Sequence, residues 1–284
     1  MKNGMIYVLI TALLFTTHEP VSKLFAASFD PYSVTAIRFL IGGLVLLPLS
    51  LMEIKKKQIK LEGKDFLVLT GLGVLFICIS MVVLQVAVAI SENPAVVAII
   101  FSSNSIITII ISSLFLKSKM TKRKVIGVIL CAIGVLIAAD FSKGGSNILS
   151  IALAIVSALT FSIYTVLSKK FMTKLSGVIQ TGFSFVIGSV ILFIVIALSG
   201  VIEIRDVNPV NVTQLLYISI FVTGVGYWAY FTAIKKGGPQ KAALVFFIKP
   251  VLTPFAAYLI LGAPISGSVI IALAVVLLGA WLAN

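Results

Sequence analysis

The sequence predicts an all-α integral membrane protein with ten transmembrane helices, and three observations support this fold class. Hydrophobic residues make up 60% of the 284 positions and charged residues only 11%, whereas a soluble domain has roughly 45–50% apolar and about 25% charged residues. Apolar runs long enough to span a bilayer recur along the chain, separated by polar breaks. They show no alternation of period two, so the expected spanning elements are helices rather than the strands of a barrel.

The first span begins almost at the N-terminus, where Lys2 precedes an apolar run in the manner of a secretion signal. No small-residue cleavage site follows, so this stretch is expected to be a retained helix. Between spans the chain carries residues that begin or end helices, such as Asp30-Pro31, Asn93-Pro94 and Asn208-Pro209. The ten predicted spans cover residues 4–26, 31–52, 66–89, 94–116, 124–139, 148–168, 177–199, 212–234, 241–261 and 267–283.

The basic residues, which give the chain a formal net charge of +13, are distributed unevenly among the loops. With the N-terminus in the cytoplasm, 17 of the 22 lysines and arginines fall in inner loops and helix ends, and only Lys143 and Arg205 fall in outer loops. Cytoplasmic loops of membrane proteins carry this excess. The distribution therefore predicts a multi-pass protein of the plasma membrane with both termini in the cytoplasm. It excludes a nucleic-acid partner as the reason for the charge.

The two halves of the chain match at a nearly constant offset, which indicates an internal repeat. The matched pairs, at offsets of 145 or 146, include Phe15 with Phe161, Lys23 with Lys169, Gly42 with Gly188 and Pro94 with Pro239. The predicted units are residues 1–140 and 147–284. Each holds five spans, an odd number, so the second unit enters the membrane inverted. Inverted repeats are typical of transporters that bind a substrate near the membrane midplane and expose it alternately to the two sides.

Four segments carry a recognisable pattern. They are the polar first span ending in Lys23, the pair Arg38-Phe39 in the second span, the run 114–121 in the fourth, and the stretch 249–266 in the ninth. Together they resemble the drug/metabolite transporter superfamily, EamA type, over nearly the whole chain. Ser118 and Ala263 stand where members of that family usually carry a glutamate. The resemblance implies two five-helix units and secondary transport of a small metabolite, with export as the expected direction.

Three ionisable residues, Glu19, Arg38 and Lys249, lie well inside predicted spans, where each costs about 2.5–3.5 kcal/mol unless it is paired or hydrated. Glu19 precedes the first hairpin turn near Ser28, and Arg38 follows it at a similar separation, so both lie about 13–15 Å from the turn. We expect them to form an intramembrane ion pair, which either fixes the hairpin or exchanges with a proton or substrate at Glu19. His18 is a candidate proton relay beside Glu19, since imidazole titrates near neutral pH.

Lys249 is the candidate contact for an anionic group of a substrate. It matches Asn104 in the repeat, which brings two polar side chains near the predicted symmetry axis. Pro250 and Pro254 follow it and remove backbone hydrogen bonds, as is typical of helices that line cavities. Two alternatives are open: Lys249 meets Glu19 instead, or it extends its ammonium group to the cytoplasmic interface and binds nothing.

Aromatic and amide residues near the middle of the spans form a second group of candidate pocket residues. Trp228 and Tyr230 lie in the eighth span. In the repeat Tyr164 matches His18, and Gln85 matches Tyr230. Such side chains stack on a substrate or on its ammonium group. Aromatic residues also gather at membrane interfaces for reasons unrelated to binding, so both interpretations are open.

Together these features predict a secondary transporter that exports small polar metabolites by alternating access, with proton coupling through Glu19. Three membrane-embedded cations, Lys23, Arg38 and Lys249, against one anion favour a substrate that carries a carboxylate, such as an amino acid. One alternative is a carrier of a cationic amine or quaternary ammonium compound, with Glu19 as its counter-charge. The alternative from another class is a non-transporting membrane sensor or a lipid scramblase.

No nucleotide-binding, metal-binding or hydrolase motif is present in the sequence, so the chain is not expected to be an enzyme or to hold a cofactor or metal. The expected partners are a small-molecule substrate, the lipid bilayer and protons, with no nucleic acid. A homodimer is left open.

Overall fold

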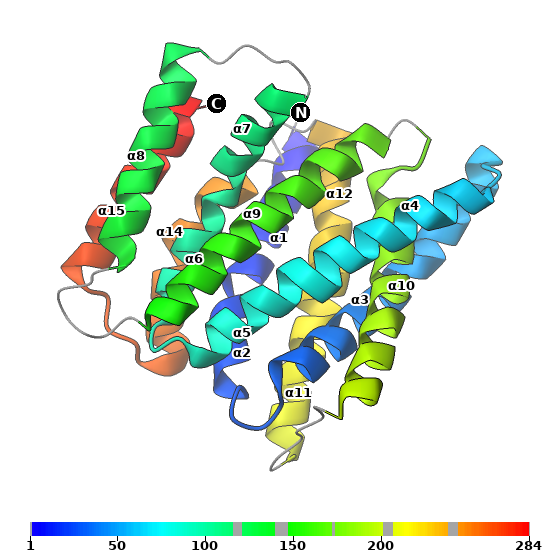
Figure 1. Ribbon diagram of the computed structural model, residues 1–284, viewed down its shortest axis with the longest axis horizontal. Coiled ribbons are helices and arrows are strands. Elements are labelled where there is room, and N and C mark those ends of the chain that lie inside the picture. The colour runs from blue at the N-terminus through cyan, green and yellow to red at the C-terminus, as the bar shows by residue number, and fades with distance from the viewer. Residues whose placement is uncertain are drawn as a thin grey trace.

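The structure, a computed structural model, describes residues 2–115, 121–139, 147–171, 174–200, 207–237 and 244–283. Within these ranges helices dominate, and they pack side by side as one bundle (Figure 1). The prediction of an all-helical fold is therefore confirmed for the part of the chain described. Six helical stretches are long and apolar enough to cross a membrane, namely Gly4–Leu24, Pro31–Lys57, Gly63–Ile90, Ile148–Phe171, Gly177–Ser199 and Pro209–Ala233.

Each predicted span falls on one helix or on consecutive helical segments. The helices are α1 (Lys2–Thr16), α2 (His18–Leu24), α3 (Pro31–Lys57), α4 (Gly63–Gly73), η1 (Val74–Met81), α5 (Val82–Ile90), α6 (Pro94–Ser102), α7 (Asn104–Phe115), α8 (Lys122–Ala139), α9 (Ile148–Phe171), α10 (Gly177–Ser199), α11 (Pro209–Tyr217), η3 (Ile218–Val225), α12 (Gly226–Gly237), α14 (Val245–Leu261) and α15 (Gly267–Ala283). Residues 116 and 241–243 of the predicted spans lie outside the described residues. The shorter apolar helices include Ile248–Leu261 and Gly267–Gly279, so a count of ten crossings stays a prediction.

Three helices begin where the sequence places an acidic or amide residue before a proline. The Asp30 carboxylate accepts hydrogen bonds from the backbone N–H groups of Tyr32 and Ser33 at 3.0 and 2.8 Å, and Asn93 and Asn208 cap α6 and α11 in the same way. These side chains satisfy N–H groups that have no partner inside the helix. Proline is favoured at the next position because it lacks the N–H group that would be left unpaired there.

Two helices are interrupted in the interior of the bundle. The helical conformation is interrupted at Thr17, between α1 and α2, and at Ser103, between α6 and α7. The Thr17 hydroxyl donates to the carbonyl of Leu14 at 2.8 Å and the Ser103 hydroxyl to that of Ile100 at 2.6 Å. Serine and threonine hydroxyls that bond back to the preceding turn bend helices. Each break makes the next residue, His18 or Asn104, the first of a new helix.

Two further segments depart from α-helical geometry. Residues Val74–Met81 and Ile218–Val225 are π-helical, and each lies within one long apolar stretch. Widened turns of this kind are rare and occur frequently at functional sites. The second segment follows the first by 144 residues at both of its ends.

The middle of the bundle is a cluster of aromatic rings drawn from several helices. Phe76 stacks on Phe185 with ring centroids 5.3 Å apart and on Tyr164 at 4.5 Å. Phe39 meets Phe76 and Phe185 edge-on at 5.2 and 4.7 Å. The rings belong to α3, η1, α9 and α10, so this cluster joins the first half of the chain to the second. At one edge of the bundle α8 and α15 lie side by side (Figure 1).

Helices α4 and α10 approach so closely that only glycine fits between them. A Cβ atom on Gly73 would lie 2.6 Å from the carbonyl oxygen of Ser184, and one on Gly188 would lie 2.7 Å from the carbonyl oxygen of Gly73. Both obstacles are backbone atoms, which cannot rotate away. Small residues at helix contacts in membranes permit this close approach.

The alanine variant Gly73→Ala is therefore expected to lower the melting temperature of the detergent-purified protein, because overpacking costs about 1–3 kcal/mol. Gly71→Ala, on the same helix with no heavy atom within 4 Å of the added Cβ, is the matched control and should melt at or slightly above the wild-type temperature. Equal melting temperatures for the two variants would contradict the close contact.

Candidate functional site

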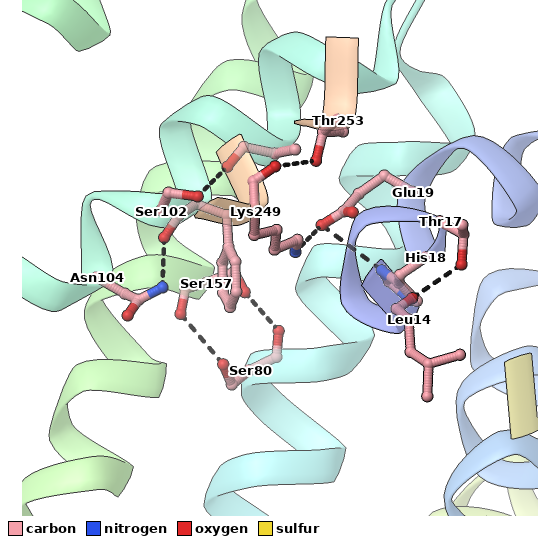
Figure 2. A network of polar contacts seen from close by, with 12 residues as sticks. Leu14, Thr17, His18, Glu19, Ser80, Ser102, Asn104, Ser157, Lys249 and Thr253 are labelled. Atoms are coloured by element: carbon pink, nitrogen blue, oxygen red, sulfur yellow. Dashed lines mark hydrogen bonds and ion pairs between the residues drawn. The ribbon is translucent and has the colours of Figure 1, made fainter. Parts of the chain in front are cut away.

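Two of the charges buried in the interior of the described structure form an ion pair between helices α2 and α14. Lys249 donates from Nζ to Oε1 of Glu19 at 2.5 Å. Glu19 has no exposed surface and Lys249 is 6% exposed. Figure 2 shows the two side chains pointing toward each other across the gap between their helices. A charge buried this far from water requires a partner, so the pair fixes α2 against α14.

Three groups surround the pair. The Nδ1 atom of His18 lies 3.6 Å from the same Glu19 oxygen, and the Lys249 ammonium group lies over the Phe101 ring, 5.5 Å from its centroid. The Thr253 hydroxyl donates to the carbonyl of Lys249 at 2.8 Å (Figure 2). Glu19 Oε2 and His18 Nε2 are buried and form no hydrogen bond within the described residues. The Glu19 carboxylate thus pairs with Lys249 through Oε1, and its Oε2 accepts no hydrogen bond from the described residues.

The predicted ion pair between Glu19 and Arg38 is not present, because Glu19 pairs with Lys249 instead. Arg38 is 3% exposed, and its guanidinium carbon lies 4.4 Å from the centroid of the Phe39 ring. The distances of Glu19 and Arg38 from the hairpin turn predict that the two residues lie at a similar depth along their helix axes. They do not predict the direction in which each side chain points around its helix, and Glu19 faces α14. The charge of Arg38 still interacts electrostatically with His18 and Glu19 over a longer distance.

Asn104, the repeat partner of Lys249, is buried at the start of α7 close to the pair (Figure 2). Its side-chain amide nitrogen donates to the backbone carbonyl of Phe101 at 2.7 Å. The backbone carbonyl of Asn104 accepts from the Ser162 hydroxyl at 2.8 Å. These bonds hold the break between α6 and α7 and attach it to α9. Asn104 thus uses its amide nitrogen on the backbone, and its predicted role beside Lys249 in a substrate site stays a prediction.

The remaining predicted site residues separate into buried and peripheral positions. Tyr164 is buried in the aromatic cluster, and Gln85 is 2% exposed with its side-chain oxygen unpaired within the described residues. Tyr230 is half-buried and contacts Phe246 edge-on at 5.8 Å. Trp228 is 36% exposed and packs against Tyr7 at the outside of the bundle, so the structure does not bring it to the ion pair.

One inward-facing aromatic residue was not among the predicted site residues, and one predicted membrane-embedded cation has another role. Tyr227, the neighbour of Trp228, faces inward and packs against Phe185 with ring centroids 5.1 Å apart. Consecutive helix residues point about 100° apart, so only one of the two adjacent rings can face the interior. The side chains that pack against each face of the helix decide which one it is. Lys23 is half-buried and donates to the carbonyl of Ala89 at 2.7 Å. It therefore satisfies the end of α5 and is not part of the charged site.

Two polar contacts tie the halves together at opposite ends of the bundle. At the end where α3 finishes, Lys174 binds Asp65 at 2.6 Å and Glu62 at 3.4 Å. At the end where α3 begins, the amide nitrogen of Asn211 donates to the Ser28 hydroxyl at 2.7 Å. Lys174 and Asn211 belong to the second half of the chain and their partners to the first. One end of the bundle is thus joined by charges and the other by a neutral hydrogen bond.

The charged contact shifts the titration of its members. Hydrogen bonds from Lys64 and Lys174 lower the pKa of Glu62, and the hydrogen bond to Asp65 raises the pKa of Lys174. The contact is therefore complete at neutral pH. It is lost as the pH falls through the lowered pKa values of both Glu62 and Asp65, or rises through the raised pKa of Lys174. All of these side chains except Asp65 are exposed, so salt also weakens the contact.

Comparison with known proteins identifies the class of this molecule. The EamA-like transporter family matches residues 2–139 and 148–284. A protein of Clostridium kluyveri named an uncharacterized transporter is 36% identical over 287 residues, covering 98% of this chain and 92% of that protein. Uncharacterized transporters of Archaeoglobus fulgidus (27% identical, covering 89% of this chain and 88% of that protein) and Bacillus subtilis (28%, covering 96% and 88%) are also similar.

The fold is similar to a protein of known crystal structure, with a TM-score of 0.69 over 100% of this chain and 97% of that one at 17% sequence identity. The match to transporters over the whole chain and the apolar helices together define a multi-pass membrane protein. The chain belongs to the EamA-like transporter family. The family resemblance of the sequence is thereby confirmed.

Removal of one member of the ion pair should destabilise the protein. Glu19→Gln leaves the Lys249 ammonium buried without a counter-charge, a loss of about 3–5 kcal/mol in comparable buried pairs. The double variant Glu19→Gln/Lys249→Met removes both charges and is expected to melt close to the wild-type temperature. Melting curves of the purified variants measure this coupling. A loss in the double variant equal to the sum of the losses in Glu19→Gln and Lys249→Met, each measured alone, would show that the two residues act independently.

Proposed function

We propose that this protein is a secondary transporter that exports small metabolites carrying a carboxylate, such as amino acids, across the plasma membrane. The observation that carries the proposal is the buried Glu19–Lys249 pair, which joins a helix of the first half to a helix of the second. A transporter of this kind must break and remake a contact between its halves in every cycle. Intramembrane charges are costly to insert and commonly mark ion or substrate pathways.

The proposed mechanism is alternating access between two inverted five-helix units, residues 1–140 and 147–284. Three features recur at nearly the same offset and support it. The π-helical segments are 144 residues apart, Gly42 and Gly188 are 146 apart, and Asp65 and Asn211, which make the two end contacts, are also 146 apart. Ser28 and Lys174, their partners, have the same offset of 146. The two end contacts thus correspond to each other under the proposed repeat.

The uneven distribution of basic residues supports an orientation with both termini in the cytoplasm. In that orientation the charged contact at Lys174 lies on the cytoplasmic face and the neutral contact at Ser28 on the outer face. We propose that each closes its face during half of the cycle.

Glu19 is the proposed coupling residue. Protonation of its carboxylate removes the charge that holds Lys249, so the contact between α2 and α14 weakens and the units can separate. Pro250 and Pro254 favour this movement, because α14 lacks two backbone hydrogen bonds next to Lys249. His18, 3.6 Å from Glu19, is placed to pass a proton to it.

The carrier of cationic amines is supported less well. Its counter-charge was to be Glu19, whose carboxylate is already neutralised by Lys249. Its aromatic pocket was to include Trp228, which lies at the periphery. The sensor and scramblase alternatives have no feature of the described structure in their favour, whereas the named relatives are transporters.

Transport by the purified protein in proteoliposomes tests the proposal. Of a panel of radiolabelled amino acids, organic acids and amines, at least one carboxylate is expected to exchange across the membrane, at a rate that depends on pH. Glu19→Gln is expected to remove the pH dependence and to reduce the rate at least about tenfold. Glu53→Gln is the matched control, because Glu53 pairs with Lys57 at a helix end, away from the site. Transport of amines alone, or an unchanged pH profile in Glu19→Gln, would overturn the proposal.

The unequal end contacts generate a separate expectation. Lys174→Gln should open the Lys174 face, and Lys64→Gln is its control, because Lys64 pairs with Glu62 within the same half. Spin labels at the exposed positions Gln58 and Lys170 would report longer distances in Lys174→Gln than in Lys64→Gln or wild type. Acidification below the lowered pKa values of both Glu62 and Asp65 should act in the same direction. Identical distance distributions in all three proteins would contradict a gating role for this contact.

A further inference from the structure

Arg38 is the buried charge that the ion pair leaves without a counter-charge. Within the described residues, Glu19, Arg38 and Lys249 are the charged side chains buried in the interior of the bundle. Glu19 and Lys249 neutralise each other. With His18 in its neutral form, the site therefore carries a single positive charge, and that charge resides on Arg38.

Two of the three guanidinium nitrogens of Arg38 also lack a hydrogen-bond partner within the described residues. Its Nε and Nη1 atoms are buried and form no hydrogen bond within the described part of the chain. A guanidinium group presents its N–H donors in a planar fork that fits a carboxylate with two parallel hydrogen bonds. Burial of such a group without an acceptor is costly. The cost is repaid if a ligand supplies the acceptor during the transport cycle.

The side chains around Arg38 indicate what kind of group would lie next to a bound anionic group. The guanidinium lies on the Phe39 ring, and this ring continues into the aromatic cluster through Phe76 and Phe185. Tyr227 packs against the same cluster and interacts electrostatically with Arg38. A ligand that places its anionic group on Arg38 therefore meets aromatic side chains with its remaining atoms. Apolar and aromatic groups bind favourably there.

We propose that Arg38 binds the carboxylate of the transported substrate, and that the single uncompensated charge selects a monoanion with an apolar or aromatic body over a zwitterion or a cation. This inference rests on the proposed function and narrows its substrate class to carboxylates without an ammonium group, which sets aside the amino acids given above as an example. Lys249, the anion contact expected from the sequence, serves Glu19 instead. The ammonium group of a zwitterion would add another positive charge beside Arg38 and Lys249, which disfavours it.

Three probes that share a two-carbon chain on a phenyl ring test the charge preference. They are 3-phenylpropionate, phenylalanine and 2-phenylethylamine, which carry a carboxylate alone, both charges, and an ammonium alone. Binding to the purified wild-type protein is measured by calorimetry. The affinity is expected to be highest for 3-phenylpropionate, with phenylalanine at least about tenfold weaker, a difference of about 1.4 kcal/mol, and the amine weakest. Preference for phenylalanine or the amine, or binding of none of the three, would overturn the proposal.

The variant Arg38→Met separates ligand binding from a structural role. It is expected to lose at least about tenfold in affinity for 3-phenylpropionate, while its melting temperature without ligand stays at or above that of wild type. Lys170→Gln, which removes an exposed charge from α9, is the control and should retain binding. A lower melting temperature in Arg38→Met with unchanged affinity would assign Arg38 to the fold alone. Because these are equilibrium measurements, that outcome would leave the transport proposal standing.

Discussion

The Glu19–Lys249 ion pair is the interaction on which the interior of this protein depends. Each charge alone would cost about 2.5–3.5 kcal/mol in the membrane, and the two residues are 230 positions apart in the chain. Their pairing therefore requires α2 and α14 to be brought together by the fold. The same arrangement makes the pair sensitive, because a proton on Glu19 or a competing ion removes the attraction without changing any covalent bond.

The surrounding structure meets the demands that this pair imposes. Two hydroxyl groups near the site bond to backbone carbonyls, Thr253 to that of Lys249 and Thr17 to that of Leu14, so these two add no unsatisfied groups. The breaks at Thr17 and Ser103 place polar residues at helix starts in the interior. Close glycine contacts between α4 and α10 hold the rest of the bundle tightly packed.

Much of the helical architecture could be predicted from the sequence, because a bilayer leaves helices or barrels as the only options and polar breaks mark their ends. Glu19, His18, Asn104 and Lys249 could be identified because polar residues are conspicuous in apolar spans. Which charges pair could not be predicted, since hairpin depth gives the height of Glu19 and Arg38 but not their rotation. The inward turn of Tyr227 in place of Trp228 has the same cause.

The central claim is that the Glu19–Lys249 pair serves transport and is more than a structural link. The most direct test is the rate of carboxylate transport against pH in the folded double variant Glu19→Gln/Lys249→Met, compared with wild type in the same proteoliposomes. The variant keeps the shape of the site and removes its switchable charges. We expect the double variant to fold and melt normally but to have lost pH-dependent transport. Wild-type rates with a wild-type pH profile in this variant would contradict it.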